Sequence, residues 1–226
     1  MRRVMTLYRS SVGKKYLMAL SGAFLFLFLI GHMFGNLKVF MGADAFNHYA
    51  EWLREVGYPA LPHGVFLWIF RVVLLGAVGI HIFAAWETYQ QSRRATGSRY
   101  AHKLQNLSFS YASRTMRWGG LIILAFVIYH LMHFTIGNAH PDFTPGDAYG
   151  NLVIGFQAPA VAGFYLLAVS ALALHLYHGL WSATQTLGAS HPKYDKFRRP
   201  LAAILTVAIY FGFISVPISV LMGVVS

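Results

Sequence analysis

The sequence contains no cysteine and few acidic residues. Its 226 residues include only seven Asp and Glu, against 18 Lys and Arg, and charged residues make up 11% of the chain. Without cysteine the chain can form no disulfide, no thiolate-ligated iron–sulfur cluster and no haem attached through cysteine. Any redox centre that it holds must therefore use other ligands.

The sequence is rich in hydrophobic residues, which make up 57% of it, and its mean hydropathy is +0.52. A soluble domain of this length could not hide so many apolar side chains, so the composition indicates an integral membrane protein. The formal net charge of +11 would suit nucleic-acid binding if the basic residues shared one soluble face. They lie instead in short clusters between apolar runs, which indicates membrane topology and no nucleic-acid partner.

Five apolar segments are long enough to cross a bilayer, which takes roughly 20 residues per helix. We predict an all-α integral membrane protein with one membrane domain over residues 1–226. The first span follows Lys14 and Lys15 without a small-residue cleavage pattern, so we predict a retained span and not a signal peptide. The spans are expected near residues 14–40, 63–90, 114–136, 160–187 and 200–224.

The basic residues also predict the orientation. Most of them lie before the first span, between the second and third, or between the fourth and fifth, whereas the 3–4 connection has none. Basic loops stay in the cytoplasm, so we expect a cytoplasmic N-terminus and an external C-terminus. The clustered residues are Arg2, Arg3, Arg9, Lys14, Lys15, Arg93, Arg94, Arg99, Lys103, Arg114, Arg117, Lys193, Lys196, Arg198 and Arg199.

The two external connections have the composition of structured segments. Residues 44–55 start with a capping Asp and carry apolar residues at helical spacing, which predicts a short interfacial helix. Residues 141–159 open with turn residues and end in an apolar stretch, which we expect to fold back over the bundle.

Each of the first four spans contains internal histidine. At a rise of about 1.5 Å per residue, His32 and His130 lie about 12 Å and 9 Å from the external ends of their spans. His81 and His175 lie about 13 Å and 18 Å from the cytoplasmic ends of theirs. The depths predict two histidine pairs stacked across the membrane, each contributed by alternate helices of an antiparallel bundle.

Two opposed imidazoles suit haem better than a bare metal ion. Zinc or copper takes three or four ligands, and no cysteine or carboxylate lies at either level. Haem needs two axial ligands and an apolar slot, so we infer two bis-histidine b-type haems. Spacing alone leaves His133 as an alternative to His130, and His178 as an alternative to His175.

The sequence resembles the single-chain, five-helix, di-haem cytochrome b membrane anchor of succinate:quinone oxidoreductases, the succinate dehydrogenase and fumarate reductase class. The match extends over nearly the whole chain in family order, and HLYHGLWSATQTLG is its most specific segment. The other matching segments are KKYLMALSGAFLFLFLIGHMFGNL, AFNHYAEWL, RVVLLGAVGIHIFAAW and ASRTMRWGGLIILAFVIYHLMHFTIG.

The resemblance implies haem ligands at His32, His81, His130 and His175, with the first and third helices holding the haem far from the soluble subunits. It leaves His133 and His178 in supporting roles. Fumarate-reducing members carry an acidic residue two positions before the fourth ligand, whereas this sequence has Ala173. A proton route through an acidic side chain at that position is therefore not expected.

The resemblance also implies partners and a reaction. A flavoprotein would oxidise succinate, an iron–sulfur protein would relay electrons, and this chain would anchor both on the cytoplasmic side and exchange electrons with quinone, by resemblance menaquinone. Catalysis on succinate and fumarate would then belong to the partner subunits. The expected location is the cytoplasmic membrane of a bacterial or archaeal-type cell.

Several polar residues are candidates for binding haem propionates or quinone. Arg71 lies about 15 Å outward of His81, at the level of the outer haem, and is a candidate for a propionate or for snorkelling to the interface. The other candidates for haem contacts are Ser21, Arg114, Arg117, Ser182, Thr186, His133 and His178. Candidates for a quinone site are Asn36, His48, Tyr49, His133 and Gln157 externally, and Tyr89, Arg114 and Trp118 on the cytoplasmic side.

Two other functions fit parts of the pattern. A cytochrome b of a hydrogenase or formate dehydrogenase also uses histidines in a helical bundle, but the distribution over four successive spans and the HLYHGLW segment disfavour it. A transporter with a histidine relay would need acidic partners, and spans 1, 3, 4 and 5 contain no Asp or Glu.

Overall fold

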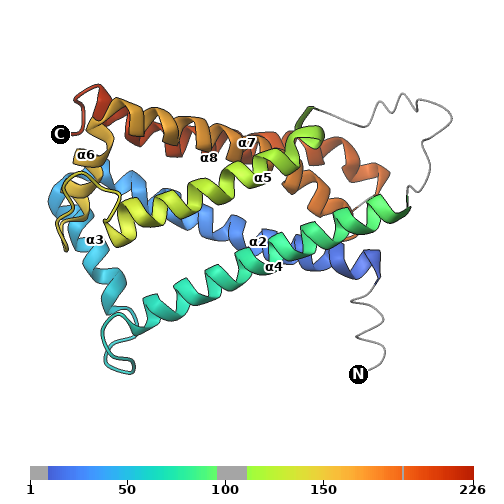
Figure 1. Cartoon of the computed structure of the whole chain (residues 1–226), viewed down its shortest axis with the longest axis horizontal. Helices are drawn as coiled ribbons and strands as arrows, with labels where there is room; N and C mark the ends of the chain where they lie inside the picture. The colour runs from blue at the N-terminus through green and yellow to red at the C-terminus, as the bar shows by residue number, and fades with distance from the viewer. Residues whose placement is uncertain (1–9, 96–110, 190) are drawn as a thin grey trace.

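The computed structural model describes residues 10–95, 111–189 and 191–226. Within these ranges the chain is helical, and five helices are long and apolar enough to cross a membrane. Figure 1 shows these helices running alternately in opposite directions along the long axis of the molecule. The predicted all-α, five-span architecture is confirmed.

The membrane-spanning elements are close to the predicted segments. They are α2 (Ser11–Leu37) with its short continuation η1 (Lys38–Met41), α4 (Val65–Ala95), α5 (Tyr111–His130) with η2 (Leu131–Ile136), α7 (Pro159–Thr186) and α8 (Pro192–Leu221). Large apolar side chains such as Leu27, Val72 and Ile204 are more than 60% exposed on them. Such an apolar exterior suits lipid as the surrounding medium.

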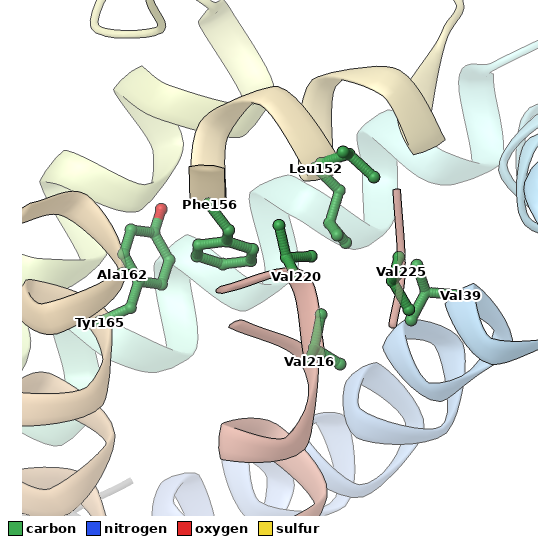
Figure 2. Close-up of a cluster of buried hydrophobic side chains, with 9 residues drawn as sticks. Val39, Leu152, Phe156, Ala162, Tyr165, Val216, Val220 and Val225 are labelled. Carbon is green, nitrogen blue, oxygen red and sulfur yellow. The ribbon is translucent and has the colours of Figure 1, made fainter. Parts of the chain in front are cut away.

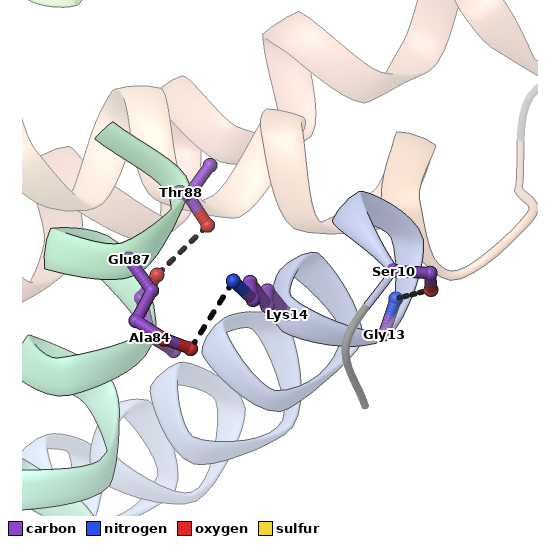
Figure 3. A network of polar contacts seen from close by, with 6 residues as sticks. All are labelled: Ser10, Gly13, Lys14, Ala84, Glu87 and Thr88. Carbon is purple, nitrogen blue, oxygen red and sulfur yellow. Dashed lines mark hydrogen bonds and ion pairs between the residues drawn. The ribbon is translucent and has the colours of Figure 1, made fainter. Parts of the chain in front are cut away.

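Two local contacts account for the start of α2 and its attachment to α4. The Ser10 side chain accepts a hydrogen bond from the Gly13 amide at 3.0 Å, which caps the helix. Four residues into α2, Lys14 forms an ion pair of 3.4 Å with Glu87 on α4 (Figure 3). The acidic residue of the second span is thus paired with a lysine at the helix end.

Two short helices lie at the end of the bundle opposite the start of α2 (Figure 1). The predicted interfacial helix is present as α3 (Ala43–Glu55), and the segment expected to fold back contains α6 (Ala148–Gln157). Asp147 caps α6 by accepting hydrogen bonds from the Gly150 amide at 2.9 Å and from Asn47 at 3.0 Å. These bonds stabilise the carboxylate and lower the pKa of Asp147.

The main hydrophobic core lies beneath α6 and not in the middle of the bundle. Leu152, Val153 and Phe156 of α6 are buried against residues of α7, α8 and η1 (Figure 2). A second, smaller cluster joins Met33, Leu176 and Ile209. Gly212 lets α8 approach α2 here, since a Cβ at that position would collide with the Met33 thioether.

Packing among the first four spans is uneven. α2 packs along α4 and α5 packs along α7, whereas α2 with α5, and α4 with α7, make little contact through the residues described here. The four helices therefore form two closely packed pairs, which meet each other where α2 contacts α7. Space for side chains is left between α2 and α5, and between α4 and α7.

Candidate functional site

The predicted histidine pairs face each other across the space between the helix pairs. The ring centroids of His32 on α2 and His130 on α5 lie 5.8 Å apart. The centroids of His81 on α4 and His175 on α7 lie 6.2 Å apart. Each pair thus joins one helix of the α2–α4 pair to one helix of the α5–α7 pair.

These separations match the geometry of two imidazoles on one iron. A bond between a metal and an imidazole nitrogen is about 2 Å long, so two opposed rings place their centroids roughly 6 Å apart. In both pairs the helices that carry the histidines are not closely packed, which is compatible with a flat macrocycle between them. No group of three or more His, Cys, Asp or Glu suited to a metal ion occurs among the described residues, so each pair offers two ligands and no more.

The inner pair has one well-oriented histidine. His81 Nδ1 lies 3.1 Å from the Met18 carbonyl and 3.3 Å from the Ser21 hydroxyl. A proton on Nδ1 that is donated to the carbonyl leaves Nε2 free as a metal ligand, the usual second-shell arrangement of ligating histidine. Gly22 permits this approach, because a Cβ there would lie 3.1 Å from His81 Cε1.

The other histidine of the inner pair, His175, lacks the hydrogen bonds that orient His81. His175 Nδ1 is buried and has no hydrogen-bond partner among the residues that the structure describes, and the same is true of His178 Nδ1. The His178 ring packs edge-on against Trp181 with a centroid distance of 5.5 Å. His175, rather than His178, is therefore the histidine that faces the ring of His81.

The outer level differs because two histidines share one tyrosine. The Tyr165 hydroxyl on α7 lies 3.3 Å from His130 Nδ1 and 3.0 Å from His133 Nδ1. His133 is fully buried and packs on Phe134, His140 and Tyr129, away from the ring of His32. Sequence reasoning did not find Tyr165, although its position about 15 Å outward of His175 was a usable signal.

The candidates for propionate contacts are dispersed. Ser21 donates a hydrogen bond to the Leu17 carbonyl at 2.7 Å and lies beside His81. Arg71 stacks on Trp68 at 4.9 Å, and Arg117 on α5 stacks on Tyr89 of α4 at 4.6 Å. The side chain of Arg114 lies outside the described part of the structure, as do Arg2, Arg3, Arg9, Arg99 and Lys103.

The candidates for quinone contacts fall into two groups. At the end of the bundle that carries α3 and α6, Tyr49 of α3 packs on Gly35, and the neighbouring Asn36 donates to the His32 carbonyl at 2.7 Å. His48 and Gln157 are exposed. At the opposite end Tyr89 is held by Arg117, while Trp118 is 70% exposed.

Fold and site together define a multi-pass helical membrane protein with two opposed histidine pairs at two levels, the arrangement expected of a membrane cytochrome b. The chain is 26% identical over 186 residues to the succinate dehydrogenase cytochrome b558 subunit of Bacillus subtilis (strain 168). The aligned region covers 82% of this chain and 84% of that protein. This relative confirms the resemblance to the cytochrome b anchor family of succinate:quinone oxidoreductases. No protein-family model matches the sequence, and no solved structure matches it significantly.

Proposed function

We propose that this chain is the membrane anchor and cytochrome b subunit of a succinate dehydrogenase. In this role it passes electrons between the iron–sulfur subunit and membrane quinone through two b-type haems. The observation that carries the proposal is the pair of facing histidines at each of two levels. The name and coverage of the relative from Bacillus subtilis support the assignment to succinate dehydrogenase.

The chain's own residues supply the ligands and the spacing. His32 and His130 hold the outer haem, and His81 and His175 hold the inner one. A b-type haem held by two imidazoles supplies one-electron transfer. The Met18 carbonyl orients His81, and the spaces between α2 and α5 and between α4 and α7 provide the slots.

The proposed orientation follows from the charges. The start of α2, the end of α4 and the start of α8 carry basic clusters and face the cytoplasm, where the flavoprotein and iron–sulfur subunits dock. α3 and α6 then lie on the external side. The quinone exchanges electrons with this subunit, and menaquinone is the type proposed from the family resemblance.

Haem content tests the proposal directly. We expect the purified complex to contain about two low-spin b haems per copy of this chain, counted by pyridine haemochrome against protein. Replacement of the exposed His48 by alanine is the matched control and leaves the count unchanged. A wild-type complex that assembles without haem would refute the proposed function.

A further inference from the structure

Tyr165 is the polar side chain placed between the two histidines that lie one turn apart on the third span. Its side chain is only 5% exposed, and its hydroxyl lies within hydrogen-bond distance of Nδ1 of both His130 and His133. The haem-ligand assignment gives no role to Tyr165 and leaves His133 as a supporting residue. The contacts give both residues a specific role.

The phenol ring of Tyr165 is held in place by its neighbours. Phe126 and Phe156 both pack edge-on against it, with centroid distances of 5.0 Å and 4.9 Å. Figure 2 shows Tyr165 beside Phe156 within the cluster beneath α6. A ring clamped in this way presents its hydroxyl in one place, so the hydroxyl can define the orientation of an imidazole.

The local backbone brings both histidines to that hydroxyl. His130 ends the regular helix α5, and His133 lies in the wider π-helical turn of η2. Insertions of this kind re-aim side chains and are frequent at functional sites. Here the turn places His133 against α6, where a Cβ at Gly155 would lie 2.8 Å from the His133 ring.

The direction of the hydrogen bonds follows from the ligand assignment. A His130 that binds iron through Nε2 carries its proton on Nδ1 and donates it to the Tyr165 oxygen. The Tyr165 hydroxyl proton is then free to be donated to His133 Nδ1, the shorter of the two contacts at 3.0 Å.

His140 is not an alternative acceptor for Tyr165. It donates from Nε2 to the Asn151 carbonyl at 2.7 Å and accepts at Nδ1 from the Asp142 amide at 3.1 Å. Both of its ring nitrogens are thus occupied, and it serves to stack on His133 at a centroid distance of 4.9 Å. His133 is left as the acceptor that completes the chain.

We propose that Tyr165 is a positioning residue for the outer haem, holding His130 by accepting its Nδ1 proton while His133 orients the tyrosine hydroxyl. The inference rests on the proposed function, because it assumes that His130 is a haem ligand. A hydrogen bond from Nδ1 to an acceptor makes the imidazole a stronger donor to iron, which favours the oxidised state. The outer haem is therefore held at a lower potential than it would have without Tyr165.

The test is a redox titration of the complex carrying Tyr165→Phe. This variant keeps the ring contacts and removes only the hydroxyl, so both haems stay bound. We expect the equilibrium constant for reduction of the outer haem to rise about tenfold, equal to about 59 mV for a one-electron couple, with the inner haem unchanged. The haem lost from His130→Ala identifies which of the two is the outer one.

Tyr210→Phe is the matched control. It also removes a tyrosine hydroxyl in contact with a span, at 3.3 Å from the Ser170 hydroxyl, and within the described part of the chain no hydrogen bond joins this hydroxyl to a histidine of either pair. Neither haem potential moves in this variant. An equal shift of both haems in Tyr165→Phe, or no shift of either, would overturn the inference.

A double-mutant cycle tests the part assigned to His133. His133→Leu leaves the bond from His130 to Tyr165 but removes the acceptor of the hydroxyl proton, so the outer haem moves in the same direction by less. The double variant is expected to show the same shift in outer-haem potential as Tyr165→Phe alone. Tyr165→Phe already removes the hydroxyl that links His130 to His133, so the second substitution has no further bond to break. Additive shifts would show that His133 acts independently of Tyr165.

The proposed function and this inference can fail separately. A wild-type complex without haem would refute both, whereas a complex with two haems that are both insensitive to Tyr165→Phe would refute the inference alone.

Discussion

Replacement of His130 by alanine is expected to remove one haem from the complex, whereas His133→Ala is expected to retain both. The His130 ring faces His32 at a centroid distance of 5.8 Å, so its loss would leave the proposed outer haem with His32 as its one histidine ligand. The His133 ring is directed into the contact between η2 and α6, where Gly155 approaches it. Haem content and the low-spin spectrum of each variant are the measurements.

The two variants control for each other. They lie one turn apart, and the more buried residue is His133, which is fully inaccessible to solvent. His133→Ala therefore creates the larger packing defect and lowers the free energy of unfolding by about 2 kcal/mol, while keeping its haems. If His133→Ala lost the outer haem and His130→Ala retained it, the ligand assignment would be reversed.

The depth of a residue could be predicted from the sequence, but the direction of its side chain around the helix could not. Counting residues from the ends of the spans matched His32 with His130 and His81 with His175, and the structure places those rings opposite each other. Depth depends only on the helical rise, which is nearly constant. It is therefore the coordinate that a sequence reveals best in a membrane protein.

The direction in which a side chain points around its helix depends on how the helices pack. The sequence therefore could not predict which residues would contact the histidines. Arg71 and Tyr165 lie at the same predicted level, about 15 Å outward of an inner histidine. Arg71 stacks on Trp68 of its own helix, whereas the Tyr165 hydroxyl meets two histidines of α5 and η2. Nothing in the residue types distinguishes these outcomes, because they follow from which helix faces lie against each other.

The location of the hydrophobic core has the same explanation. The apolar stretch within residues 141–159 predicted a segment folded over the bundle, and α6 does bury Leu152, Val153 and Phe156. The sequence did not predict that this contact forms the main core, while the middle of the bundle is bridged by histidines. Only the arrangement of the helices reveals that α2 and α5, and likewise α4 and α7, are not closely packed against each other.

Gly22→Leu is expected to abolish binding of the inner haem. Even a Cβ at this position would lie 3.1 Å from His81 Cε1 and 3.4 Å from His81 Nδ1, which is tighter than an ordinary contact. The remaining atoms of leucine would occupy the place of the imidazole ring and break its hydrogen bond to the Met18 carbonyl. An inner ligand that is displaced in this way can no longer reach iron at a bond length of about 2 Å.

Gly31→Leu provides the matched comparison on the same helix. Gly31 is exposed and a Cβ there meets nothing within 4 Å among the described residues, so the added side chain displaces no histidine and both haems are expected to remain. The pair separates a steric effect on His81 from a general effect of replacing glycine in α2. The measurements are haem counts and redox titrations of the two variants. The smaller change Gly22→Ala is expected to retain the inner haem with a shifted potential. Retention of two haems with wild-type potentials in Gly22→Leu would show that the ring of His81 is free to move, and that its contacts with Gly22 and Met18 do not define the inner site.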